Sequence, residues 1–330
     1  MAGLIKFTKK GIYCPKADVY IDPWGSVDRA LITHAHSDHA RRGHKHYLCH
    51  NHSINVLILR LGDINVQGIE YGEKISINGV DISYHPAGHV VGSSQIRIAN
   101  KKEIWVISGD YKLQNDNVST PYEPIKCDYF ITESTFGIPA FQWEPQSVII
   151  DQINSWWSHN TAHNIPSLIS AYSLGKAQRI IQNVDHNIGP VLTHGAVEKT
   201  NIAVRKSGVH LKHTELLSDQ KSDYLQKALI VCPPGASDSV WSKKIKNHVK
   251  GVASGWMALR GTRRRRHADQ GFILSDHVDW NELNQAVDLS GAHTVYVTHG
   301  YSNIFAKWLR EKGLQSSVLE TAFEGEMLVE

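Results

Sequence analysis

The chain has 330 residues, of which 41% are apolar and 20% are charged, a composition that argues against a disordered or fibrous protein. Its length suits one large domain or two ordinary ones. The net charge of +3 permits an anionic ligand but does not establish one. Because there is no bilayer-length apolar run and no apolar signal core at the start, we expect a cytoplasmic protein.

Short apolar runs separated by turns fill the first 140 residues and predict buried strands at 18–22, 30–33, 104–108 and 129–132. The pattern then changes. Helical spacing at 145–157 and 174–184 alternates with strand-like runs at 167–171, 190–192 and 228–231. From Gly271 the first pattern returns, with runs at 272–274 and 294–298. We therefore predict a discontinuous first domain, residues 1–140 and 266–330, with an α/β domain inserted at 141–265.

Histidine is the unusual count, at 20, and histidine is the commonest metal ligand. The predicted strand at 30–33 runs directly into the sequence His34-Ala35-His36-Ser37-Asp38-His39. Spacing of i, i+2 suits an irregular loop that directs alternate side chains at two neighbouring metal positions. The mixture of nitrogen and carboxylate ligands suits zinc or manganese. The alternative is a polar surface loop that holds these residues by chance.

Other apolar strands also end in residues of ligand or acid–base type. Asp110, Glu133, His277 and His299 follow such strands, and His89 follows a Pro-Ala-Gly turn. A single ending of this kind is more often a cap or a turn residue. Together they indicate a functional cleft at the carboxyl ends of the strands, where open α/β sheets bind their ligands.

These residues carry a resemblance to the metallo-β-lactamase superfamily. Its H-x-H-x-D-H signature is matched at 34–39, and His89 and Asp110 match its third and fourth motifs. Three later residues resemble the motifs of the β-CASP branch, whose members are nucleases: Glu133, His277 and His299. The resemblance covers essentially the whole chain. It implies an α/β fold, the metallo-β-lactamase αββα sandwich, with an α/β β-CASP-like cap domain inserted after Glu133.

Within that branch, three phrases resemble the bacterial DNA-ligase-associated exonucleases, at 21–24, 254–257 and 271–277. This resemblance implies DNA as the substrate, with RNA as the alternative. It also implies partners in the same repair pathway, namely an ATP-dependent DNA ligase and a helicase.

The resemblance assigns a role to each motif residue and implies two divalent ions, Zn or Mn. The ligands of the first ion would be His34, His36 and His89. The ligands of the second would be Asp38, His39 and His299. Asp110 would bridge the two, and Asp22 would orient the signature loop from behind it. The crosslink-repair exonucleases of the branch lack a histidine at the position of His299, so their strand polarity is not safely transferred to this chain.

The expected reaction is hydrolysis of a phosphodiester. Two metals can supply hydroxide at neutral pH and hold the phosphate oxygens. His277, oriented by Glu133, would then protonate the leaving oxygen, which contributes roughly 10²–10⁴-fold in rate. The predicted catalytic residues are Asp38, Asp110, Glu133 and His277, in a metal-dependent DNA exonuclease.

Three segments are candidates for holding the substrate. An arginine cluster could face the phosphate backbone or could be a solvated basic turn: Arg260, Arg263, Arg264, Arg265 and Arg266. The segment from Ser173 to Lys176 predicts a helix start whose amides and lysine suit a phosphate, although an ordinary N-cap is equally compatible. Trp256 could stack on a base or pack between the domains.

A second histidine-rich patch follows the signature: His44, His46, Cys49, His50 and His52. A third metal is conceivable there, but we favour helix and loop histidines near the site. We expect structural roles for His85 and His194 and core positions for Trp156 and Trp157.

Three alternative functions stay open at this point: an RNA-processing β-CASP ribonuclease, a small-molecule metallo-hydrolase and a non-catalytic nucleic-acid scaffold. The inserted domain and the three later motifs argue against the small-molecule hydrolase, and the complete ligand set argues against the scaffold. Residue chemistry alone does not separate DNA from RNA.

Overall fold

The computed structural model describes residues 3–217, 222–265 and 267–320. They divide into two compact units. The first unit takes the residues up to 115, residues 119–142 and the residues from His277 onward, and the second takes residues 116–118 and 143–276. Within these ranges, no helix combines the length and the apolar character that a bilayer crossing requires.

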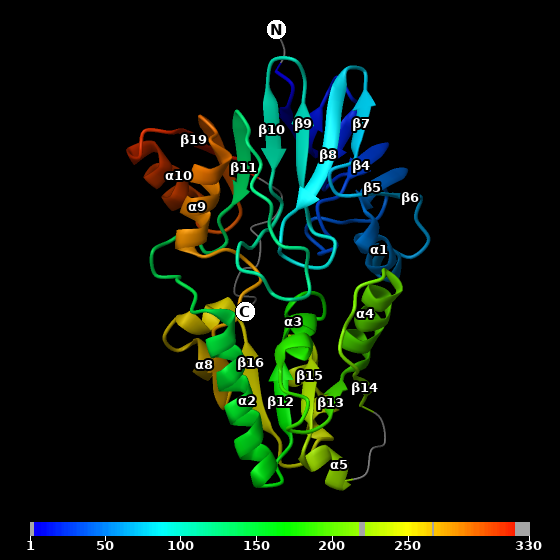
Figure 1. Cartoon of the computed structure of the whole chain (residues 1–330), viewed down its shortest axis with the longest axis vertical. Helices are drawn as coiled ribbons and strands as arrows, with labels where there is room; N and C mark the ends of the chain where they lie inside the picture. Colours follow the sequence, from blue (N-terminus) through cyan, green and yellow to red (C-terminus); the bar gives the residue numbers. More distant parts are fainter. Residues whose placement is uncertain (1–2, 218–221, 266, 321–330) are drawn as a thin grey trace. The chain divides into compact units, whose positions relative to one another are not determined.

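Two sheets form the centre of the first unit (Figure 1). The first sheet has the order β1-β2-β3-β4-β5-β6, with strands Lys6–Thr8, Gly11–Cys14, Val19–Ile21, Arg29–Leu31, His46–His50 and Val66–Ile69. The second has the order β19-β18-β11-β10-β9-β8-β7. Its strands are β7 Lys74–Ile77, β8 Val80–Pro86, β9 Ser94–Ala99, β10 Ile104–Ile107, β11 Tyr129–Glu133, β18 Thr294–Thr298 and β19 Gln315–Val318.

Apolar side chains of both sheets fill the space between them, among them Ile21 and Leu31 of the first sheet and Ile98 and Ile107 of the second. The short η1 (Asn51–Ser53) leads into α1 (Ile54–Leu61), which contacts β6. Helices α9 (Trp280–Ser290) and α10 (Ser302–Glu311) bury their apolar residues on the second sheet, and Figure 1 shows them beside β11 and β19. Helices α9 and α10 thus cover one face of the second sheet, and the first sheet packs on its other face.

The directions of the strands determine which loops lie at the same edge of a sheet. Strands β3 to β6 are parallel to one another, and so are β10, β11, β18 and β19. Strand β8 has the direction of β10, because both are antiparallel to β9. Since parallel strands end at the same edge of their sheet, the loops that follow β8, β10, β11 and β18 share one edge of the second sheet.

The second unit has one sheet of six parallel strands in the order β14-β13-β15-β12-β16-β17. Its strands are β12 Ser167–Ser170, β13 Val191–Thr193, β14 Glu215–Leu216, β15 Leu229–Cys232, β16 Val249–Ala253 and β17 Gln270–Phe272. Its helices are α2 Gln146–Ala162, α3 Lys176–Asn183, α4 Gly195–Lys206, α5 Ser222–Gln226, α6 Pro234–Ser237, α7 Val240–Lys243, η2 Gly255–Ala258 and α8 Thr262–Arg265. Apolar residues of α2 and α3 pack on one face of the sheet, and those of α5, α6 and α7 pack on the other.

The helices expected at 145–157 and 174–184 correspond to α2 and α3. Trp157 of α2 is fully buried and Trp156 packs against the same core, as predicted. One expectation is wrong. The apolar run at 272–274 was assigned to the first domain, but β17 pairs with β16, so the second unit continues to Asp276, beyond the predicted boundary at 266. A short buried strand has the same apolar pattern in either sheet.

Candidate metal centre

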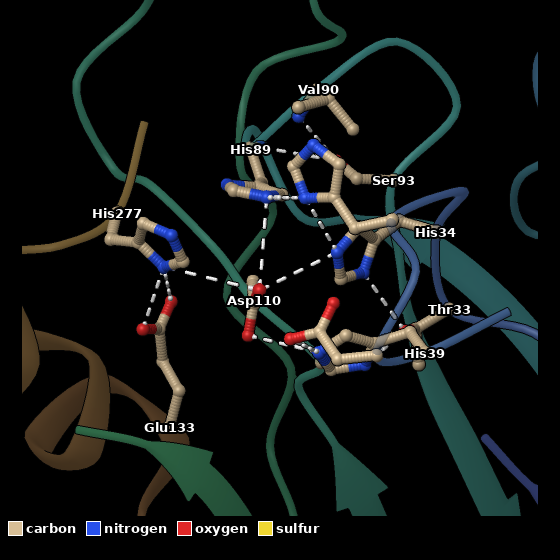
Figure 2. Close-up of polar contacts among 12 residues, drawn as sticks. Thr33, His34, His39, His89, Val90, Ser93, Asp110, Glu133 and His277 are labelled. Atoms are coloured by element: carbon tan, nitrogen blue, oxygen red, sulfur yellow. Dashed lines mark hydrogen bonds and ion pairs between the residues drawn. The ribbon is translucent and has the colours of Figure 1, made fainter. Parts of the chain in front are cut away.

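The side chains that the sequence singled out in the first unit converge on Asp110 (Figure 2). They come from loops that follow β4, β8, β10 and β18, from the last residue of β11 and, for His277, from the segment between β17 and α9. Three groups have ligand atoms within 4.8 Å of one another: His34, His36, His89 and Asp110; Asp38, His39 and His299; and Asp110, Glu133 and His277. The seven predicted metal ligands therefore form the first two groups.

The first group presents ring nitrogens to one another. Nδ1 of His36 lies 3.1 Å from Nε2 of His34 and 3.1 Å from Nε2 of His89. Burial, together with the neighbouring histidines, holds the pKa of His34 and of His89 well below the usual value, so these rings are neutral. Neutral imidazoles with converging nitrogens are the ligands that zinc and manganese accept.

The second group contains buried polar atoms that lack hydrogen bonds. Nε2 of His39 and Oδ1 of Asp110 lie 3.4 Å apart, and neither has a hydrogen-bond partner among the residues that the structure describes. Nε2 of His39 is also 3.7 Å from Asp38, and the rings of His39 and His299 are 5.3 Å apart. Unsatisfied buried polar atoms are costly, and an ion at this position would satisfy both, so these residues fit a metal.

The carboxylate of Asp110 faces both groups. Its Oδ2 lies 3.4 Å from Nε2 of His34 and 3.8 Å from Nε2 of His89, whereas its Oδ1 faces His39. Although burial opposes ionisation, the surrounding histidines, chiefly His39 and His277, hold the pKa of Asp110 well below its usual value. One ionised side chain thus offers an oxygen to each ligand group, which is the geometry of a bridging ligand.

Asp22 fixes the signature loop from behind. Its Oδ2 lies 2.7 Å from Nδ1 of His39, and its two oxygens accept hydrogen bonds from the amide and the hydroxyl of Thr33, at 2.8 and 2.5 Å. A proton on Nδ1 leaves Nε2 of His39 for a metal, as carboxylates behind metal-binding histidines commonly arrange. The role predicted for Asp22 is consistent with these contacts.

Backbone turns that favour glycine place two of the histidines. Gly88 has φ +74°, and a Cβ there would lie 2.2 Å from the carbonyl of Lys112, so glycine is required before His89. At Gly300, with φ +64°, a Cβ would lie 2.5 Å from the carbonyl oxygen of Ser134, and Ser134 Oγ donates to the carbonyl of His299 at 2.5 Å. His299 itself has φ 59°, a conformation that non-glycine residues rarely adopt outside functional sites.

Glu133 and His277 form a buried pair beside Asp110. Nδ1 of His277 lies 2.8 and 3.0 Å from the two carboxylate oxygens of Glu133, and Oε1 of Glu133 also accepts from the amide of Tyr111 at 2.9 Å. The same nitrogen of His277 is 4.0 Å from Oδ2 of Asp110. The pair therefore has the geometry of a carboxylate that orients a histidine. The short distance between His277 and Asp110 would also permit His277 to be a metal ligand.

Arg60 is a further residue beside the signature loop, and the sequence did not predict it. It lies near the end of α1 and donates to the carbonyl of Ala35, which separates the first two histidines of the signature. The guanidinium therefore helps to fix the loop that carries the ligands. A lone arginine on an otherwise apolar helix was the only signal, and its partner is 25 residues away in the chain.

The substrate candidates lie in the second unit. Helix α3 begins at Lys176, as expected, but Lys176 is buried and its ammonium lies 3.2 Å from the carboxylate of Asp276. The charge of Lys176 is therefore already compensated, which argues against a phosphate role for this lysine. The carbonyl of Ser173 accepts from the side chain of Gln178, inside the same turn.

The arginine cluster is only partly described. Arg260 and Arg264 are exposed and line a shallow hollow with Gly261 and Ala268. Arg263 and Arg265 belong to α8, and Arg266 lies outside the described residues. Trp256 is half-buried in η2.

The second histidine-rich patch gives no metal-ligand group among the described residues. His46, Cys49 and His50 belong to strand β5, not to a helix or loop as expected. Burial raises the pKa of Cys49 to about 12, which excludes a reactive thiolate at neutral pH. His194 caps α4 by accepting from the amide of Ala196, and His85 contacts Ser83 and Glu123, which agrees with structural roles.

Comparison with known proteins finds relatives that match between 47% and 94% of this chain. A "Probable DNA ligase" of Opitutus terrae is 26% identical over 318 residues, which cover 94% of this chain and 30% of that protein. "Endoribonuclease YSH1" of Mycosarcoma maydis is 23% identical over 86% of this chain and 42% of its own length. "Cleavage and polyadenylation specificity factor subunit 3" of Dictyostelium discoideum is 27% identical over 47% of this chain and 20% of its own length. The chain thus spans less than half of each of these relatives.

No family model matches the chain. Among solved structures, a protein of unknown function from Enterococcus faecalis V583 superimposes with a TM-score of 0.58 at 11% identity, over 88% of this chain and 79% of that one, which supports the fold alone. The two-sheet first unit, the clustered ligand residues and these relatives support the resemblance of the chain to the β-CASP branch of the metallo-β-lactamase fold.

Proposed function

We propose that this protein is a metal-dependent phosphodiesterase that hydrolyses nucleic acid, and that it acts as a DNA exonuclease in DNA repair in the cytoplasm. The observation that carries the proposal is the position of Asp110, whose two oxygens face two separate ligand groups while the Glu133–His277 pair lies alongside. A single-metal hydrolase needs neither the second group nor the pair.

The residues divide the work of the reaction. Two divalent ions, Zn or Mn, held by the first two groups would activate water and neutralise the negative charge of the phosphodiester. Asp110 keeps the two groups at a fixed separation, and Asp22 keeps His39 in the tautomer that ligates. Because these contacts are made by buried side chains, the site is ordered before the substrate arrives, which is what electrostatic catalysis requires.

His277 is proposed to deliver the proton that the leaving oxygen needs. The Glu133 carboxylate accepts from Nδ1 and so fixes the ring, and it stabilises the positive charge of the doubly protonated form. Nε2 on the other side of the ring would then donate to the alkoxide. Loss of this proton transfer is expected to slow hydrolysis by roughly 10²–10⁴-fold.

The preference for DNA is supported by the relative named a DNA ligase, which matches almost the entire chain. A DNA ligase, with a helicase of the same pathway, is therefore the partner that we propose. The second candidate is a ribonuclease, which the relatives named endoribonucleases favour, although each matches a smaller share of this chain than the relative named a DNA ligase.

Digestion of end-labelled nucleic acid tests the proposal. Single- and double-stranded DNA and RNA of one sequence are incubated with the protein and Zn or Mn, and metal content is measured on the same preparation. We expect two ions per chain, stepwise shortening of DNA from an end, and little loss of RNA. Preferential RNA cleavage would replace the exonuclease by the ribonuclease, and no cleavage of either would reject the nuclease altogether.

A further inference from the structure

The sheet of the second unit has a reversal in its winding. Strands β12 and β15 are hydrogen-bonded neighbours, and the chain leaves them for opposite sides of the sheet. From β12 it passes through α3 to β13, and from β15 it passes through α6 and α7 to β16. Helix α3 packs on one face, and α6 and α7 pack on the other.

Such a reversal creates a crevice, because the two connections separate at the carboxyl ends of the neighbouring strands. Open parallel sheets bind their ligands in this crevice. This unit therefore has, by its topology, a preferred ligand position that is independent of the metal-ligand groups of the first unit.

A hollow occupies this position. Its wall comes from the ends of three strands and the segments after them: Ser170 and Tyr172 after β12, Ser237 and Asp238 after β15, and Ser254 and Trp256 after β16. The enclosed part of the hollow measures about 40 Å³, well below the roughly 300–1,000 Å³ typical of small-molecule sites, so a ligand would lie across its open mouth against the lining side chains and would be only partly buried. All of its lining residues belong to the second unit.

The charge of the hollow argues against a phosphate. Lys250, which also lines it, is buried, and its ammonium lies 2.5 Å from the carboxylate of Asp238. The positive charge is thus neutralised within the site. A phosphate would have to compete with this carboxylate, whereas a neutral ligand would not.

The aromatic residues favour a flat ligand. Ser254 Oγ accepts from the amide of Trp256 at 3.3 Å, which fixes the start of η2. The ammonium of Lys176 lies 4.8 Å from the ring centre of Tyr172, a cation–π contact that helps to orient that ring. Two aromatic rings, serine hydroxyls and one paired carboxylate match the apolar faces and the polar edges of a nucleobase.

We propose that this hollow, the base site, binds one nucleobase of the nucleic-acid strand, with Trp256 stacking on the base and Asp238 accepting a hydrogen bond from its edge. The inference rests on the proposed function in so far as the ligand is a nucleic acid, but it concerns binding and not hydrolysis. It gives the second unit a recognition role that depends on bases and not on phosphate charge.

Binding of single-stranded oligonucleotides to the metal-loaded full chain tests the base site. Phosphorothioate linkages limit cleavage, and a second oligonucleotide of equal length and charge carries abasic positions. Because stacking on an aromatic side chain contributes about 1–3 kcal/mol per base, Trp256→Ala should weaken binding of the normal strand by about 5- to 150-fold. It should leave the abasic strand unchanged.

Three further variants separate stacking from loss of folding. Trp256→Phe should retain most of the affinity, and Asp238→Asn should alter the preference among homopolymers. Trp308→Ala, which removes a partly exposed tryptophan of α10 in the first unit, should change nothing. Equal losses for normal and abasic strands, or none with Trp256→Ala, would overturn the base site. So would a free mononucleotide that binds as tightly as the strand.

The two proposals fail separately. Base-dependent binding without hydrolysis would reject the nuclease and keep the base site. Hydrolysis with binding that is indifferent to bases would keep the nuclease and reject the base site.

Discussion

Both units place polar side chains at the carboxyl ends of their strands, but they equip those ends differently. In the first unit the ends carry groups of histidines and carboxylates whose ligand atoms lie within 4.8 Å of one another, and Asp22 and Ser134 fix two of these histidines through hydrogen bonds. In the second they carry aromatic rings, hydroxyls and an ion pair that is already neutral. The contrast indicates that one unit is built to concentrate charge on a reacting centre, whereas the other is built to hold a ligand without adding charge.

The largest effect is expected from a variant that removes the charge between the two ligand groups. Asp110→Asn keeps the shape of the side chain but loses the carboxylate, so hydrolysis should fall nearly to background and metal content should drop, while circular dichroism stays that of a folded protein. Near-normal hydrolysis by this variant would mean that the first unit does not concentrate charge in the way described.

Removal of the proposed acid comes next. His277→Ala should slow cleavage of DNA by roughly 10²–10⁴-fold with both metals retained. A nitrophenyl phosphodiester, whose leaving group needs little protonation, should be hydrolysed almost normally. Glu133→Gln should cause a smaller loss. If His277→Ala loses metal and fails equally on both substrates, His277 is a ligand and His299 becomes the candidate acid.

Variants of the arginine cluster test whether the second unit also binds DNA through charge. Arg260 and Arg264 are exposed. Replacing both by glutamine should make the slope of log K for DNA binding against log salt concentration shallower by about 0.9 per lost phosphate contact. Exposed Lys243 and Lys244 of the same unit provide a control of equal charge, and their replacement should leave the slope unaltered. Identical slopes for the two double variants would show that these arginines face only solvent.

The smallest effect concerns stability in the first unit. His50 is buried against Tyr71, with ring centres 3.5 Å apart, and burial lowers its pKa to about 4. Since its pKa in the unfolded chain is about 6.5, its contribution to stability is complete above that pH and is lost as the pH falls toward 4. The difference in unfolding temperature, His50→Phe minus the unmodified protein, should therefore be more favourable to the variant at pH 5 than at pH 7. A constant difference in unfolding temperature would contradict this.

Much of the first unit could be predicted because its signals are local. The signature at 34–39 places four ligands within six residues, and strand ends at Asp110 and His299 are visible in the apolar pattern. What failed depends on distant partners. Lys176 is buried because Asp276, 100 positions further along, compensates it, and the sheet that receives β17 is decided by pairing with β16. Arg60 is recognisable only once Ala35 lies beside it.

Because of the order of the ligands along the chain, the two ligand groups become complete at different stages of synthesis. The first group, from His34 to Asp110, is complete before the inserted unit begins, whereas the second waits for His299, which follows that unit. Because contacts between distant residues close slowly and domains fold as they emerge during synthesis, we expect the first position to take up its ion early and the second only after the inserted unit has been made. A nascent chain would thus carry an incomplete centre until His299 has emerged.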